Sequence, residues 1–291
     1  MLINTILQQV KIYLSKANEG QAEMSEEIIQ EVGEQFKNLL RERFNPYEEK
    51  DFSLRMSNIG RPLCQLWMEK NKVPKSPLSY NHSFKMVLGD VVEVLAVAVL
   101  KAAGVNVEEW QKKVELPIGD TKIKGTLDVK IDGGVYDIKS ASPFAFQHKF
   151  DNPRGFSKLL EDDPFGYVSQ GYLYGKADNA DFKGWIAIEK STGEWTILET
   201  PYSSTGYAKS AAKEAATTIE HLNEAKEFRR CFEPENETFN GKETGNKVLP
   251  LTCAFCSWKE KCWEGEGLVH ADNPRSKARY PQKRWYLGTI K

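Results

Sequence analysis

The stretch from Lys113 to Ser140 constrains the fold of this chain more than any other. Apolar and polar residues alternate there along three short β-rich segments: Lys113–Ile118, Lys122–Ile131 and Val135–Ser140. Turn-forming residues separate the segments, first Gly119-Asp120 and then Asp132-Gly133-Gly134, and such sequences are typical of β-hairpins. We therefore expect a meander of three strands in the middle of the chain.

Helical spacing of apolar residues predicts helices on both sides of this meander. Two are expected in roughly the first 45 residues, the second beginning after Ser25 as its N-cap, and a third is expected from Ser83 to Ala103. The elements expected downstream are a helix, a hairpin and a longer helix: Pro164–Ala177, Gly184–Glu189 with Trp195–Glu199, and Tyr207–Arg230. This order predicts an α/β fold in which a mixed central β-sheet is flanked by helices.

The composition limits the classes of protein that the chain can represent. It has 291 residues, 40% of them hydrophobic, with 40 Lys and Arg against 41 Asp and Glu and a formal net charge of −1. These values exclude a disordered chain and a polybasic binder of the histone type. The apolar run Val94–Leu100 is far shorter than the roughly 20 residues that span a bilayer, and the N-terminus lacks the features of a secretory signal. We expect a cytoplasmic protein without membrane contact, and a virus-encoded origin stays open.

Two carboxylates and a lysine are expected to meet on the central strands. Asp137 and Lys139 share one face of their strand, and Asp128 lies on the preceding strand across the turn. Neighbouring carboxylates repel each other, and a divalent cation such as Mg²⁺ relieves the repulsion. Lys139 could then orient water or neutralise charge on a phosphate. The alternative is an ordinary solvated strand face, because acid-x-Lys tripeptides recur elsewhere in the chain.

A third acid lies in an apolar helical stretch. Glu93 interrupts the sequence Val91–Val97, where a carboxylate is costly unless it is paired or bound to metal. Gly89, four residues earlier on the same helix face, would allow another backbone to approach closely. The alternative is that Glu93 belongs to a polar helix edge together with Asp90 and Lys101.

Gln170 and Tyr174 lie one helical turn apart, so they share a face. An amide and a hydroxyl in this arrangement suit the binding of a phosphate and of the catalytic lysine. A packed aromatic beside an exposed glutamine is an equally good interpretation of this pair.

The cysteines favour an intracellular metal site over a disulfide scaffold. The total of five is odd, and three of them form the spacing Cys253-x₂-Cys256-x₅-Cys262. Closely spaced thiolates of this kind usually bind a metal, which needs a fourth ligand. Spacing alone leaves Cys64 and Cys231 as competing candidates for that ligand.

The order of these features resembles the PD-(D/E)xK nuclease superfamily, in particular its RecB-like exonuclease branch. A Gly-x-x-x-Glu helix, an Asp strand, an Asp-x-Lys strand and a Gln-x-x-x-Tyr helix follow one another from Gly89 to Tyr174. The resemblance implies a restriction-endonuclease-like core, Mg²⁺ or Mn²⁺ as cofactor, and Lys139 as the catalytic lysine, supported by Gln170 and Tyr174. The metal ligands that it implies are Glu93, Asp128, Asp137 and the carbonyl of Ile138. This chain departs from the pattern in having Glu93 where many RecB-like members have histidine, and no proline before Asp128.

The cysteine layout is similar to that of iron–sulphur nucleases of the AddB type and of the CRISPR-associated adaptation nucleases. These proteins place one cysteine before the nuclease core and three after it. The resemblance implies a [4Fe–4S] cluster, with Cys231 as a free or buried thiol, and a structural zinc is the alternative occupant. The four cysteines that would hold either group are Cys64, Cys253, Cys256 and Cys262. Either group would stabilise the fold by tying distant segments together.

The resemblance and the motifs together divide the chain into three parts. Residues 1–81 would form a helical region that carries the first cluster cysteine, residues 82–230 the nuclease core, and residues 231–291 the cysteine segment and a tail. The tail from Pro274 onward is basic and free of acids, and its aromatic residues suit unpaired bases: Tyr280, Trp285 and Tyr286. A solvated tail with aromatics docked on the core explains the same composition.

The expected function is a metal-dependent DNA exonuclease, acting on single-stranded ends and involved in DNA recombination or repair. The alternatives are a non-catalytic, zinc-stapled nucleic-acid-binding module and a CRISPR-adaptation nuclease subunit. The chain lacks a Walker A motif, so a helicase or recombination partner would be a separate chain.

Overall fold

A computed structural model describes residues 3–45, 51–77, 80–201, 204–279, 281 and 283–291. The chain divides into two compact units. The larger unit comprises Met1–Gly60 and Tyr80–Ile219, and the smaller unit comprises Arg61–Ser79 and Glu220–Lys291.

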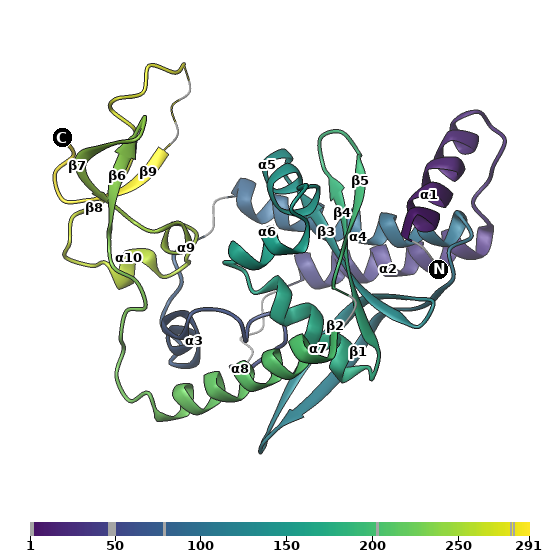
Figure 1. Ribbon diagram of the computed structural model, residues 1–291, viewed down its shortest axis with the longest axis horizontal. Coiled ribbons are helices and arrows are strands. Elements are labelled where there is room, and N and C mark those ends of the chain that lie inside the picture. The colour runs from purple at the N-terminus through teal and green to yellow at the C-terminus, as the bar shows by residue number, and fades with distance from the viewer. Residues whose placement is uncertain (1–2, 46–50, 78–79, 202–203, 280, 282) are drawn as a thin grey trace. The chain divides into compact units, whose positions relative to one another are not determined.

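The larger unit is built on a five-stranded mixed sheet (Figure 1). Its strands lie in the order of the chain: β1 (Val107–Ile118), β2 (Thr121–Ile131), β3 (Gly134–Ala141), β4 (Asp181–Glu189) and β5 (Trp195–Glu199). The β3–β4 pair is parallel, and the other three pairs are antiparallel. The predicted α/β fold with a mixed central sheet and flanking helices is therefore confirmed, and β1 begins six residues earlier than the expected segment at Lys113.

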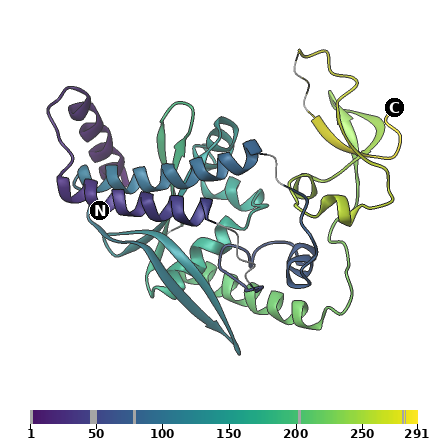
Figure 2. The same cartoon turned by 180° about the vertical axis from the view of Figure 1, so that it is seen from behind.

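The helices of the larger unit follow the predicted order. They are α1 (Ile3–Asn18), α2 (Glu26–Phe44), α4 (Tyr80–Ala102), α5 (Pro143–Ala145), α6 (Phe156–Glu161), α7 (Tyr167–Ala177) and α8 (Ser204–Glu224), with a π-helical turn at Phe146–Phe150. The last of them, α8, continues into the smaller unit from Glu220. Helix α2 lies along α4 (Figure 2), and the Oγ of Ser25 accepts a hydrogen bond from the Ile28 amide as the predicted N-cap.

The prediction that the last long helix reaches Arg230 was wrong, because α8 ends at Glu224. The Ala225 carbonyl accepts a hydrogen bond from the Trp67 indole at 3.1 Å, which gives it a partner outside the helix. The Phe228 ring then lies 5.6 Å from that of Trp67 and packs against it instead of continuing the helix.

Two faces of the sheet are covered by different helices. On one face, α1 and α4 bury a continuous core made up of Ile6, Val10, Ala96, Val97, Leu100, Val129, Ile131, Tyr136, Ile138, Ile186 and Ile188. Along β4, Ile186 and Ile188 belong to this core, so Trp185 faces the other side of the sheet, where it packs against Phe156. An irregularity in the β3–β4 register between Phe182 and Gly184 places Phe182 on the same side, against Trp185 and α7. A sheet enclosed on both sides holds its strand register firmly, which fixes the positions of polar residues on β2 and β3.

Two glycines allow α7 to approach the sheet. A Cβ atom at Gly171 would overlap the ring of Phe182, and one at Gly125 on β2 would lie 2.5 Å from a ring carbon of Tyr174. The close approach at Gly125 brings Tyr174 against the strand that carries Asp128.

The smaller unit holds a second sheet of four antiparallel strands in the order β6-β7-β9-β8. Its elements are α3 (Leu63–Lys70), β6 (Glu235–Phe239), β7 (Lys242–Val248), α9 (Leu251–Ala254), α10 (Lys259–Cys262), β8 (Leu268–Asp272) and β9 (Lys283–Leu287). The fully buried Glu237 accepts hydrogen bonds from four side chains: Thr244, Asn246, Asn273 and Tyr286. This polar interior explains why alternation of apolar residues did not predict the sheet.

Within the described ranges, every helix is too short or too polar to cross a membrane.

Candidate active site

Asp128 and Asp137 meet where β2 and β3 separate. The ladder between these strands pairs Val129 with Tyr136 and extends no further toward Asp128. Instead, the Oδ2 atom of Asp128 accepts a hydrogen bond of 2.7 Å from the backbone amide of Ile138. The Asp128 side chain thus occupies the place of a main-chain acceptor and lies beside Asp137, the residue that precedes Ile138.

Lys139 forms an ion pair with Asp137. The Nζ atom of Lys139 lies 2.6 Å from Oδ2 of Asp137, whose side chain is 1% exposed. The other carboxylate oxygen, Oδ1, is buried and has no hydrogen-bond partner among the residues that the structure describes. A buried acceptor without a partner is costly, and a bound cation is one ordinary way of satisfying it.

Glu93 approaches the same site from helix α4. A Cβ atom at Gly89 would lie 3.3 Å from Oγ of Ser140, so this part of the helix passes close to the end of β3. The neighbour at Gly89 is therefore a side chain and not the backbone that the glycine was expected to admit. Burial, together with the charge of the nearby Asp137 carboxylate, raises the pKa of Glu93 to about 7, although Lys139 opposes the change. Glu93 therefore lies within electrostatic range of both Asp137 and Lys139.

The acids and the lysine shift one another's pKa. Burial raises the pKa of Asp128 well above its ordinary value, and the charges of Glu93 and Asp137 add to this effect. Burial also raises the pKa of Asp137, although Lys139 opposes it. For Lys139, burial alone would lower the pKa, but the carboxylates of Asp137 and Asp128 raise it above its ordinary value. The site therefore holds a protonated lysine beside acids whose pKa values are raised. An added cation would lower these pKa values and favour the ionised acids.

Gln170 and Tyr174 reach the site from α7. The Nε2 atom of Gln170 donates a hydrogen bond of 3.0 Å to the hydroxyl of Tyr174. Burial raises the pKa of Tyr174 above its ordinary range, and the Asp128 charge raises it further. The structure thus brings together the six side chains predicted for the catalytic site, and the Tyr174 hydroxyl keeps its proton at neutral pH.

Gln111 also belongs to this neighbourhood, although the sequence analysis missed it. The β1–β2 ladder pairs Trp110 with Val129 and Lys112 with Leu127, so Gln111 lies opposite Asp128. Its Nε2 atom donates a short hydrogen bond to Oε1 of Glu93, and its backbone has a φ of 49°. A non-glycine residue with positive φ inside a strand is uncommon, and no sequence signal marked it.

Tyr167 is a second residue that the sequence analysis missed. It begins α7, and the Nζ atom of Lys139 lies 4.9 Å from the centre of its ring. A cation over an aromatic face is attracted to it, so the ring helps to hold the lysine in place.

The cysteines gather in the smaller unit. The backbone amide of Cys64 donates a hydrogen bond of 3.1 Å to the Sγ atom of Cys231. The Cys64 thiol lowers the pKa of the Cys231 thiol to about 6, and this backbone hydrogen bond contributes to the change. Burial raises the pKa of Cys253 to about 12, and the nearby charges of Cys256 and Cys262 contribute. Cys231, expected to be a free or buried thiol, is exposed and lies beside Cys64.

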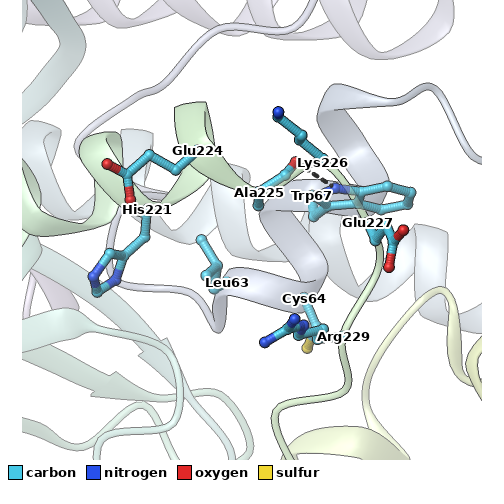
Figure 3. Close-up of a pocket in the computed structure, with 9 residues that line it drawn as sticks. All are labelled: Leu63, Cys64, Trp67, His221, Glu224, Ala225, Lys226, Glu227 and Arg229. Atoms are coloured by element: carbon cyan, nitrogen blue, oxygen red, sulfur yellow. Dashed lines mark hydrogen bonds between the residues drawn. The ribbon is translucent and has the colours of Figure 1, made fainter.

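A pocket of about 550 Å³ opens beside Cys64 in the smaller unit (Figure 3). The residues that line it are Leu63, Cys64, Trp67, His221, Glu224, Ala225, Lys226, Glu227 and Arg229. Figure 3 shows the hydrogen bond from the Trp67 indole to the Ala225 carbonyl that joins α3 to the chain after α8.

Neither set of candidate ligands forms a closed metal site. Across the described part of the chain, no group of three or more His, Cys, Asp or Glu side chains is arranged to hold a metal ion. The donor types still fit the expected groups, carboxylates for Mg²⁺ or Mn²⁺ and thiols for an iron–sulphur cluster or zinc. The metal-ligand assignments therefore stay predictions.

The aromatic residues of the C-terminal tail have different environments. Tyr280 lies outside the described residues. Trp285 stacks on His270 with ring centres 4.5 Å apart, and Lys259 lies 4.8 Å above its ring. Tyr286 is 1% exposed and donates a hydrogen bond to Glu237, so it supports the sheet and is not available to a nucleic-acid base.

Comparison with known proteins gives no family for this chain. No family model matches it, and no curated protein matches it. Among solved structures, SSO0001 is similar at a TM-score of 0.42 and 17% identity, over 79% of this chain and 94% of that one. A candidate exonuclease from Eubacterium rectale is similar at a TM-score of 0.35 and 14% identity, over 67% of this chain and 77% of that one. Likenesses at this level carry no argument about activity.

Proposed function

We propose that the chain is a Mg²⁺- or Mn²⁺-dependent deoxyribonuclease that hydrolyses phosphodiester bonds at single-stranded DNA ends. The observation that carries the proposal is the Asp137–Lys139 pair beside Asp128, with one buried Asp137 oxygen that has no hydrogen-bond partner among the described residues. Acidic oxygens for a divalent cation and a fixed ammonium for a phosphate are the two requirements of metal-assisted phosphodiester hydrolysis.

Glu93, Asp128, Asp137 and the Ile138 carbonyl would hold the metal ion. Hard divalent cations prefer oxygen ligands, and the pKa values of Glu93 and Asp128, which burial and neighbouring carboxylates raise, would be lowered by an added positive charge. When bound, the ion would lower the pKa of the attacking water and stabilise the negative charge that develops on the phosphate.

Lys139 would act as a hydrogen-bond donor and not as a base. The carboxylates of Asp137 and Asp128 raise its pKa, so its ammonium keeps the proton and can offer positive charge to a phosphate oxygen. The ring of Tyr167 and the Asp137 carboxylate hold this ammonium from two sides.

Tyr174 and Gln170 would bind the phosphate next to the lysine. The Tyr174 hydroxyl accepts its hydrogen bond from Gln170, so its own proton remains free to be donated. Because burial keeps this hydroxyl protonated, it would donate to an anionic oxygen over the whole neutral range.

A nuclease assay on end-labelled DNA with Mn²⁺ or Mg²⁺ tests the proposal. Asp137→Ala and Lys139→Ala are expected to abolish cleavage while leaving the circular dichroism spectrum unchanged. Asp120→Ala and Lys122→Ala are matched controls, because they remove a second acid-x-Lys pair from the β1–β2 hairpin, where Lys122 is 71% exposed. Full cleavage by both site variants would overturn the assignment, and comparison of 5′ and 3′ labels with a circular substrate would establish whether an end is required.

We also propose that Cys64, Cys253, Cys256 and Cys262 hold a [4Fe–4S] cluster that braces the smaller unit, with zinc as the alternative. Cys256 and Cys262 raise the pKa of Cys253, and Cys256 raises that of Cys262, so these three thiols lie close enough to share a site, as does Cys231, which acts on Cys253 and Cys262. Metal analysis of anaerobically purified protein tests this proposal: iron with sulphide supports it, and zinc alone contradicts it.

A further inference from the structure

An exposed aromatic ring lies next to the proposed phosphate site. Phe165 precedes α7 and is 46% exposed, although its ring is entirely apolar. The centre of this ring lies 5.6 Å from that of Tyr167, in a stacked arrangement with an interplanar angle of 29°. Since Tyr167 in turn lies beneath the ammonium of Lys139, only one ring separates Phe165 from the catalytic lysine.

The loop that presents Phe165 is held in place on both sides. The Asp163 carboxylate accepts hydrogen bonds of 2.9 and 2.8 Å from the amides of Tyr167 and Val168. Gly166 has a φ of 72°, and a Cβ atom there would lie 3.1 Å from the Cα atom of Gly60. A ring fixed in this way loses little conformational freedom when a ligand stacks on it.

Positive charge lies beneath this loop. The Nζ atom of Lys149 donates a hydrogen bond of 2.9 Å to the Asp162 carbonyl and lies 5.7 Å from the centre of the Phe165 ring. Lys139, which pairs with Asp137, and Lys149, which pairs with the Asp162 carboxylate at 3.5 Å, flank a short row of aromatic rings. Aromatic faces beside ammonium groups suit an unpaired base with an anionic backbone attached to it.

We propose that Phe165 is a stacking platform for an unpaired nucleobase whose phosphate lies at Lys139. The proposal rests on the proposed nuclease function and adds the part of the substrate that the site would recognise. A base pair inside a duplex is stacked on both faces and cannot present either one to Phe165, so the platform would favour single strands over internal duplex positions. Stacking of this kind does not distinguish DNA bases from RNA bases.

Binding of short fluorescent oligonucleotides in EDTA, measured by anisotropy, separates this proposal from catalysis. Phe165→Ala is expected to weaken the binding of single-stranded DNA by about 5- to 100-fold, as loss of one base–aromatic contact predicts. Phe165→Trp is expected to bind as tightly as the wild type, and Phe165→Leu as weakly as Phe165→Ala, because leucine keeps the apolar bulk and loses the aromatic face. Phe36→Ala is the matched control, since it removes a ring that is 39% exposed on α2.

An abasic series gives a readout that a merely structural residue would not change. Oligonucleotides that lack one base at successive positions should bind the wild type more weakly at one position, and at that position Phe165→Ala should cause no further loss. The same abasic series made of RNA shows whether the site prefers DNA or RNA. Tighter binding of RNA than of DNA would support Phe165 as a stacking platform and contradict DNA as the substrate in the proposed function.

The platform is overturned if Phe165→Ala or Phe165→Leu binds as tightly as the wild type, or if the wild type binds neither polynucleotide. It is also overturned if the loss in Phe165→Ala is the same on the abasic and the intact strands. If Asp137→Ala retains cleavage while Phe165→Ala loses binding, the proposed catalytic site fails and the platform stands.

Discussion

The substitution Glu93→Gln isolates the charge of one acid in the candidate site. The amide has nearly the same shape as the carboxyl group, and its oxygen can still accept the hydrogen bond from Gln111. The difference between the two proteins is that only the wild type can ionise at this position. Near it lie Asp90, Asp128, Asp137 and Lys139, whose charges act on Glu93 in both directions.

The size and sign of the effect follow from the pKa of Glu93. In the folded state this pKa is about 7 against an ordinary value of 4.5, so the wild type loses stability as pH rises from 4.5 to about 7, where the unfolded chain has released this proton and the folded protein still holds it. The difference corresponds to about 3 kcal/mol at pH above 7, and because Glu93 is half-buried, solvent screening reduces it to about 2 kcal/mol. Glu93→Gln should therefore stabilise the metal-free protein by about 2 kcal/mol well above pH 7, and by almost nothing below pH 4.5.

Urea denaturation in EDTA at acidic, neutral and alkaline pH measures this difference directly. Added Mn²⁺ should reverse the order at alkaline pH, because a bound cation stabilises only the protein that retains the carboxylate ligand. The reasoning is refuted if the variant is less stable than the wild type in EDTA at alkaline pH, or if the difference does not depend on pH.

Three further substitutions test other parts of the structure. Gln111→Ala should weaken Mn²⁺ binding by about 10-fold in calorimetry, because groups that orient metal ligands have effects of this size, and an unchanged affinity would remove Gln111 from the site. Asp178→Ala should lower the free energy of unfolding by about 2 kcal/mol, because the 2%-exposed Asp178 carboxylate pairs with Lys112 and Lys130 at 2.6 and 2.8 Å. Burial would raise the pKa of Asp178, but the two lysines lower it overall. The difference in stability between the wild type and Asp178→Ala should therefore shrink as acid protonates the carboxylate of the folded protein. A difference that is the same at all pH values would contradict the pairing. Cys64→Ala should remove iron from the purified protein and Cys231→Ala should not, as iron analysis would show; the opposite result would assign the fourth ligand to Cys231.

The central sheet could be predicted because local rules govern it. The alternation along Lys122–Ile131 matches a strand whose odd-numbered residues Val129 and Ile131 face α1 and α4, and the glycine turns mark its ends. The boundary of α8 could not be predicted in the same way, because the contact of Trp67 with Ala225 joins residues far apart in the chain.

In the candidate site, too, residues paired by local spacing could be predicted, and residues that act through other elements could not. Asp137 and Lys139 share a strand face, and Gln170 and Tyr174 share a helix face, so spacing alone was enough to pair them. Gln111 and Phe165 act through neighbours on other elements, and nothing in the local sequence distinguishes them from surface residues. The buried Glu237 hid the second sheet for a related reason, since its four hydrogen-bond donors come from several segments.

Anomalous scattering from a crystal soaked in Mn²⁺ tests the central claim most directly. The account predicts an anomalous peak in contact with carboxylate oxygens of Asp128 and Asp137 and with the Ile138 carbonyl, and its disappearance in Asp137→Ala crystals. A well-diffracting soaked crystal with no peak beside Asp137, or with the same peak in the variant, would contradict it.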